Sequence, residues 1–106
     1  MATALELSTR PGPDGIPVVT VAGEIDMSNA DRFRDALALA AADADGGSFV
    51  VDLTGVEYLD SAGVHALFEH AARIRLIAGP LLEPVLTISG LAGITSMGGV
   101  SAGEPQ

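Results

Sequence analysis

One stretch decides the fold of this chain: Phe49-Val50-Val51-Asp52-Leu53-Thr54-Gly55-Val56-Glu57-Tyr58-Leu59-Asp60-Ser61-Ala62-Gly63-Val64-His65-Ala66-Leu67-Phe68. Its first part, as far as Leu59, predicts a strand, and the part from Val64 onward predicts a helix. The junction puts Ser61 at the helix start, where backbone N–H groups lack helical partners. A phosphate on Ser61 would meet the positive end of the helix dipole, so Ser61 is a candidate switch. On spacing alone the simpler interpretation, that Ser61 is only the N-cap, is favoured.

Size and composition indicate one globular domain. The chain has 106 residues, and we expect a domain over 1–97 with a poorly ordered tail over 98–106. Cysteine is absent, which excludes disulfides, zinc thiolates and a cysteine nucleophile. The net charge of −9 disfavours nucleic acid and anionic membrane surfaces as partners. A basic or mixed-charge protein partner stays open.

Nothing in the sequence predicts export or membrane insertion. The N-terminal residues have neither a basic region nor an apolar core, so we expect no signal peptide. The stretch 74–100 is apolar, but prolines, glycines and Glu83 interrupt it, which argues against a spanning helix.

The order of the predicted elements indicates an α/β fold. We expect strands over 4–8, 16–22, 48–53 and 74–78, and helices that begin at Ser28, at Ser61 and at Leu82. Ser28 and Asp31 have the spacing of a capping box, and Asp45-Gly46-Gly47 ends that helix. The apolar run 48–53 predicts burial on both faces. Together these features predict a mixed four-stranded sheet, with its first strand antiparallel, the rest parallel, and helices mainly on one face.

The register of the C-terminal part allows an alternative. Residues 84–89 would also make a good strand, with the second helix then running from Ser61 to about Ala78. Gly79-Pro80 is a strong break and favours the first register, with a strand over 74–78 and a last helix over 82–89.

The sequence motifs give little support for a catalytic or metal site. A nucleophile elbow needs Gly-x-Ser-x-Gly, and Leu59 occupies its first glycine position. His65 would lie near Ser61 on the helix, but no third group orients it as a base. No metal-binding or phosphate-loop spacing occurs, so we expect no enzyme activity and no cofactor. Asp26, Asp52 and Asp60 lie near strand ends and could form a negative rim around Ser61, suited to docking a partner with Arg or Lys.

A family resemblance rests on three motifs. The run Val51 to Val56, with Leu59 to Leu67, resembles the signature of the bacterial STAS-domain proteins that act as anti-sigma factor antagonists. Gly23-Glu24-Ile25-Asp26 is similar to a second motif, and the segments 74–80 and 85–91 resemble the last strand and helix. The resemblance covers about residues 4–92.

The resemblance implies a cytoplasmic partner-switching protein. Such a protein binds an anti-sigma factor, usually a GHKL-type serine kinase, and thereby frees a sigma factor. The kinase phosphorylates the serine matching Ser61, which ends binding, and a phosphatase resets the cycle. The implied docking residues are Asp26, Asp60, Ser61, Ala62, Gly63 and His65. A monomer or a weak dimer is compatible with the charge pattern.

Two departures leave alternatives open. The segment after Ser61 is shorter than usual, and His65 stands where a small residue is common. The alternatives are a STAS scaffold that does not act on a sigma factor, or a module that binds a small ligand.

Overall fold

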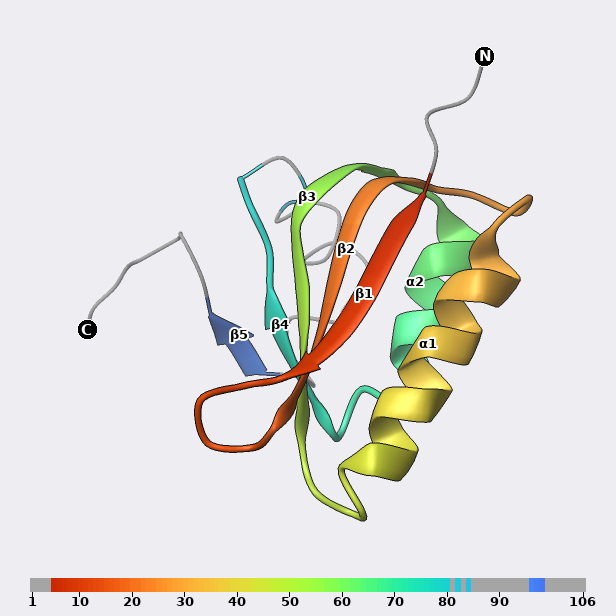
Figure 1. Ribbon diagram of the computed structural model, residues 1–106. Coiled ribbons are helices and arrows are strands. Elements are labelled where there is room, and N and C mark those ends of the chain that lie inside the picture. The colour runs from red at the N-terminus through yellow and green to blue at the C-terminus, as the bar shows by residue number, and fades with distance from the viewer. Residues whose placement is uncertain (1–4, 81, 83, 85–95, 99–106) are drawn as a thin grey trace.

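The computed structural model describes residues 5–80, 82, 84 and 96–98 as one sheet with two helices (Figure 1). The elements are β1 (Glu6–Pro11), β2 (Pro17–Ile25), α1 (Ala30–Asp43), β3 (Phe49–Leu59), α2 (Ser61–Phe68), β4 (Ile74–Ile77) and β5 (Ser96–Gly98). The strand order is β1-β2-β3-β4-β5. β1 is antiparallel to β2, and every other neighbouring pair is parallel. The predicted α/β class and the mixed sheet with an antiparallel first strand are confirmed.

The extents of the strands differ from the prediction. β1 begins and ends later than 4–8, and β2 continues to Ile25. β3 extends beyond 48–53 to Leu59, where the strand-like pattern of the opening stretch also ends. β5 adds a short fifth strand beside β4. The sequence did not predict it, because its three residues do not form the apolar run by which a strand is recognised. The strand β4 confirms the favoured register over a helix reaching Ala78.

The remaining C-terminal predictions cannot be compared with coordinates. The last helix expected over 82–89, and the alternative strand over 84–89, fall mainly outside the described residues. The expected tail also lies largely outside them. Neither helix of the described part is long and apolar enough to cross a membrane.

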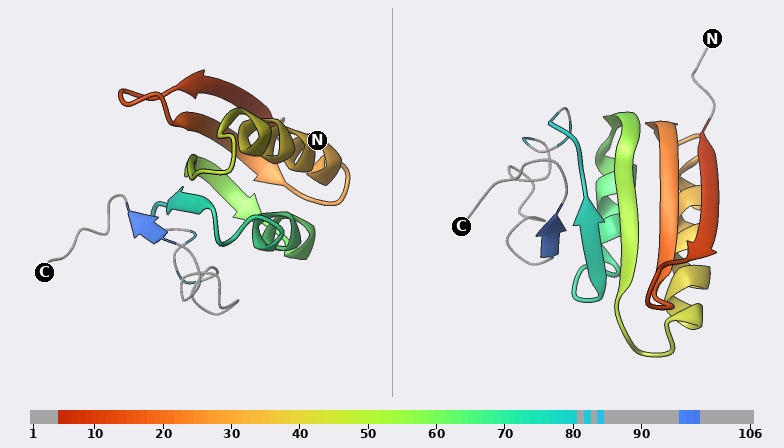
Figure 2. Two further views of the ribbon diagram at one scale, coloured as in Figure 1. Left: turned by 90° about the horizontal axis from the view of Figure 1, so that it is seen from below. Right: turned by 60° about the vertical axis from the view of Figure 1, so that its left-hand side comes forward.

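Both helices lie on one face of the sheet (Figure 2). In β3 this face carries a buried set: Phe49, Val51, Leu53, Val56 and Leu59. Val50 and Asp52 point to the other face and are only half-buried. The predicted burial of 48–53 on both faces is therefore wrong, because in the described part of the chain the helices cover one face only.

Irregular pairing between β2 and β3 keeps that buried set aligned. Thr20 pairs with Asp52, but Ala22 pairs with Gly55, so β3 holds one extra residue there. A second shift follows between Gly23 and Glu24. Such bulges reset which side chains face the core. With these two bulges, β3 stays paired with β2 as far as Leu59, so Asp60 lies at the carboxyl edge of the sheet.

Helix α1 begins at Ala30 rather than at Ser28. Asn29 is the N-cap residue and makes no side-chain capping bond, while the Ser28 hydroxyl donates to Asp26 Oδ1. The capping-box prediction is wrong, because a neighbouring carboxylate binds the serine in a turn before the helix. The predicted stop is confirmed, with positive φ angles at Asp45 (51°) and Gly46 (89°).

Candidate functional site

The carboxyl ends of β2 and β3 bring the predicted site residues together. Asp26 directly follows β2, and Asp60 directly follows β3. The backbone N–H of Asp60 donates to the Ile25 carbonyl over 3.1 Å, which ties the two strand ends to each other. We call this region the carboxyl-edge site; it comprises Asp26, Asp60, Ser61, Ala62 and Gly63.

Asp60, and not Ser61, caps α2. The Asp60 backbone is extended, with φ −92° and ψ −174°. Its Oδ1 accepts from the backbone N–H of Ala62 (2.9 Å) and of Gly63 (3.3 Å). The interpretation of Ser61 as the N-cap is therefore wrong. Two residues able to cap stand side by side in the sequence, and the end of β3 at Leu59 gives Asp60 the extended backbone that a cap requires.

Ser61 is consequently the first helical residue and lies exposed. Within the described residues its hydroxyl makes no hydrogen bond. A serine that neither caps nor packs has an accessible oxygen at the surface. This geometry suits covalent modification or contact with a partner, as the sequence pattern predicts.

Gly63 acts through packing. A Cβ at this position would lie 2.3 Å from Leu59 Cδ1 and 2.8 Å from Ile25 Cγ2. A side chain would fit there only if Leu59 and Ile25 shifted, so glycine lets the first turn of α2 approach the ends of β2 and β3. Gly63 is buried and Ala62 half-buried, and they shape the carboxyl-edge site mainly through their backbone.

The loop that holds Asp26 is tightly bonded. Asp26 Oδ1 accepts from the Ser28 hydroxyl (2.5 Å) and the Ser28 N–H (2.9 Å). Asn29 Oδ1 accepts from the Asp26 N–H (3.0 Å), and Asn29 Nδ2 donates to the Glu24 carbonyl (2.8 Å). The hydrogen bond from the Ser28 hydroxyl is the main reason that the pKa of Asp26 lies below its ordinary value. Asp26 is therefore a fixed negative charge.

Sequence reasoning missed two exposed apolar side chains beside these acids. Met27 follows Asp26 and is 84% exposed, and Tyr58 precedes the end of β3 and is 50% exposed. Large apolar side chains are usually buried, so exposed examples next to a polar site indicate a contact surface. Their exposure could have been predicted from the sequence, because each lies within one or two residues of the carboxyl end of a strand.

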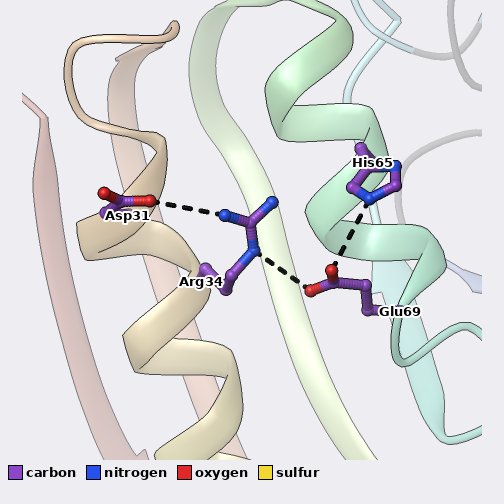
Figure 3. Close-up of polar contacts among 4 residues, drawn as sticks. All are labelled: Asp31, Arg34, His65 and Glu69. Atoms are coloured by element: carbon purple, nitrogen blue, oxygen red, sulfur yellow. Dashed lines mark hydrogen bonds and ion pairs between the residues drawn. The ribbon is translucent and has the colours of Figure 1, made fainter.

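His65 and Asp52 each bond to other residues than Ser61. His65 Nε2 is 3.6 Å from Glu69 Oε2, and Glu69 Oε1 accepts from Arg34 Nε over 3.1 Å (Figure 3). His65 thus joins a surface network between α1 and α2, and among the described residues no hydrogen bond connects it to Ser61. Asp52 lies in the first half of β3, where its Oδ1 accepts from Thr54 N and Oγ1. It stabilises the irregular part of the strand and is not part of the predicted acidic rim.

The described part of the chain does not support a metal site or a ligand pocket at the carboxyl edge. No group of three or more His, Asp or Glu residues there could hold a metal ion. Hollows of 300 and 320 Å³ lie elsewhere, between β1 and β2 and near the start of β3.

Comparisons with known proteins agree with this fold. A family model described as "Mlab, STAS domain" matches residues 9–95. No curated protein matches the chain. An anti-sigma factor antagonist from Mycobacterium paratuberculosis has a similar structure, with a TM-score of 0.79 and 28% identity, over 89% of this chain and 85% of that one.

Two more distant structures share the fold. The anti-sigma factor antagonist SpoIIAA in its unphosphorylated form has a TM-score of 0.65 and 20% identity, over 93% of this chain and 88% of that one. The Bacillus cell fate determinant SpoIIAA in its phosphorylated form has a TM-score of 0.54 and 23% identity, over 93% and 91%.

Proposed function

This chain belongs to the STAS domain family, and we propose that it is a cytoplasmic anti-sigma factor antagonist that phosphorylation of Ser61 switches off. In the active state it binds an anti-sigma factor, a GHKL-type serine kinase, and releases a sigma factor. The kinase then modifies Ser61, and a phosphatase restores the active form. The chain itself is not an enzyme.

The observation that carries the proposal is the exposed Ser61 hydroxyl beside the Asp60 cap. A kinase requires an accessible hydroxyl, and a serine engaged in capping would have to leave its bonds first. The likeness to a mycobacterial antagonist, and a relative whose structure has a phosphorylated form, support the same assignment.

The charges of the carboxyl-edge site explain how modification would act. Asp60 already occupies the N–H groups of Ala62 and Gly63, so a phosphate on Ser61 would not find those two donors free. It would add about −1.5 to −2 charge next to Asp60. In solution water screens this charge, and the fold survives. Inside an interface that matches a basic partner to Asp26 and Asp60, repulsion and desolvation would weaken binding.

A pull-down from native extract, read by mass spectrometry, tests the proposal. The baits are the wild type, Ser61→Glu and, as a matched control, Ser48→Glu, which alters an exposed serine in the loop before β3. We expect the wild type and the control to retain a GHKL-type kinase and Ser61→Glu to lose it. Phosphorylation of the wild type, but not of Ser61→Ala, by the retained kinase would identify the modified residue.

A constitutive STAS scaffold is the second candidate. The matched family model is described as "Mlab, STAS domain" and names no sigma factor, so a STAS module outside sigma-factor regulation is kept as the alternative. Equal recovery of one partner by all three baits would support the scaffold and refute the phosphorylation switch. Failure of every bait to retain a kinase would refute the anti-sigma assignment.

A further inference from the structure

We infer that the outer edge of β1 pairs with the same edge of a second copy of this chain, in a two-fold antiparallel arrangement centred on Ser8. β1 is the first strand in the sheet order, and its outer side is open in Figure 2. This edge is distinct from the carboxyl-edge site, and the inference does not rest on the proposed function.

The bonds around β1 show which backbone groups point outward. Gly12 N–H donates inward to the Ile16 carbonyl, and the direction alternates along an antiparallel strand. Leu7, Thr9 and Pro11 therefore direct their backbone groups outward. The Leu5 carbonyl fits this alternation, because Arg32 Nη2 on α1 reaches it from outside at 3.3 Å. Within the described residues no strand lies beyond β1, so Leu7 and Thr9 have no outer ladder partner.

Two opposite charges on β1 also lack an ion-pair partner among the described residues. Glu6 and Arg10 are exposed and pair with Ala22 and Val18, which places them on the face opposite the helices. Neither makes an ion pair in the described part of the chain. They lie four residues apart in one strand, about 13 Å, and cannot meet each other. Arg10 Nη1 donates to Thr20 Oγ1 over 3.1 Å, which holds its side chain on this face.

Pairing centred on Ser8 satisfies all these groups at once. Glu6 of one copy then lies opposite Arg10 of the other, twice by symmetry. Leu7 lies opposite Thr9, and each such pair exchanges two backbone hydrogen bonds. The Leu5 carbonyl, already occupied by Arg32, faces Pro11, which has no N–H to donate.

Neighbouring registers lose this match. Pairing centred on Leu7 sets Glu6 opposite Ser8, and pairing centred on Thr9 sets Arg10 opposite Ser8. Neither brings opposite charges together. Like-charged edge residues would protect an edge from self-pairing, whereas this strand is complementary to itself in one register. The net charge of −9 on each copy opposes association, so we expect a weak dimer that leaves both Ser61 sites free.

Charge reversal tests the register. Sedimentation velocity over increasing protein concentration should show the wild type dimerising. Glu6→Arg and Arg10→Glu should each weaken the dimer about tenfold or more, because two cross-strand attractions become repulsions. The double variant, and an equimolar mixture of the two single variants, should restore it. A wild type that stays monomeric at every concentration, or single variants that dimerise as well as the wild type, would overturn the inference.

A cross-link offers a second readout that does not alter the charges. The chain has no cysteine, so Ser8→Cys introduces a single thiol at the proposed two-fold axis. Opposite residues of a pair without mutual hydrogen bonds have Cα atoms about 4.5 Å apart, within reach of a disulfide. Mild oxidation should give a dimer from Ser8→Cys, and much less from Ser48→Cys, another exposed serine outside β1. Equal cross-linking of both variants would refute the pairing.

Discussion

Replacing Gly63 with alanine tests whether close packing at the start of α2 positions the carboxyl-edge site. The added Cβ would lie 2.3 Å from Leu59 Cδ1 and 2.8 Å from Ile25 Cγ2. Leu59 is 6% exposed and Ile25 is fully buried, so neither can move away freely. Overpacking of this kind costs about 1–3 kcal/mol. Alanine's better helix propensity returns about 1 kcal/mol. Because two contacts fall below 3.0 Å, we expect a cost in the upper part of that range, about 2–3 kcal/mol, and hence a net loss of about 1–2 kcal/mol.

Urea denaturation followed by circular dichroism measures the loss in the free energy of unfolding. In thermal unfolding, each kcal/mol lost lowers Tm by about 4–8 °C in a domain of this size. Leu59→Ala in the Gly63→Ala background removes the nearest clashing atom and leaves room for the new methyl group. We therefore expect the double variant to be more stable than the sum of the two single losses predicts. A Gly63→Ala variant as stable as the wild type would mean that helix propensity dominates and that the close approach does not constrain α2.

Three further predictions concern polar side chains of the site and of the surface between α1 and α2. Asp60→Ala should destabilise the fold by about 1 kcal/mol in urea denaturation, whereas Ser61→Ala should have little effect, because only Asp60 caps α2; equal losses would refute this division of roles. Ser28→Ala should raise the pKa of Asp26 in an NMR titration, since the Ser28 hydroxyl is the main cause of its depression. The stability that this bond contributes is present above the unfolded-state pKa and is lost as pH falls through the lower folded-state pKa, so the two proteins should converge in acid; a constant difference down to acid pH would contradict the assignment. Arg34→Gln should cost less than about 1 kcal/mol at low salt, and less still at high salt, because its pairs with Asp31 and Glu69 are exposed; a large loss independent of salt would show that Arg34 acts otherwise.

The sequence predicted much of the fold because strands and helices are local patterns. The order of the predicted elements indicated parallel α/β units with an antiparallel first strand, and the sheet has this arrangement. The STAS resemblance, which rested on those motifs, is confirmed by the family match over residues 9–95. β5 could not be found in this way, because it depends on β4 as its neighbour.

The site was predicted only in part. Asp26, Asp60 and Ser61 follow strand ends, and parallel strands bring their carboxyl ends to one edge, so these residues could be grouped from the sequence. The roles within the group could not be assigned. Asp60 instead of Ser61 became the cap, and Ser28 became a donor to Asp26, through backbone geometry that single-residue preferences do not contain.

The sequence by itself determined the order and type of the main elements and the place of a serine at the start of α2, because periodicity and turn chemistry act over a few residues. Tertiary structure alone decided the register of β3 against β2, which side chain caps α2, and why position 63 favours glycine. These depend on the irregular pairing of β2 with β3 and on the contact of α2 with Leu59 and Ile25. Such contacts join residues distant in the chain, and their geometry exists only once the sheet has formed.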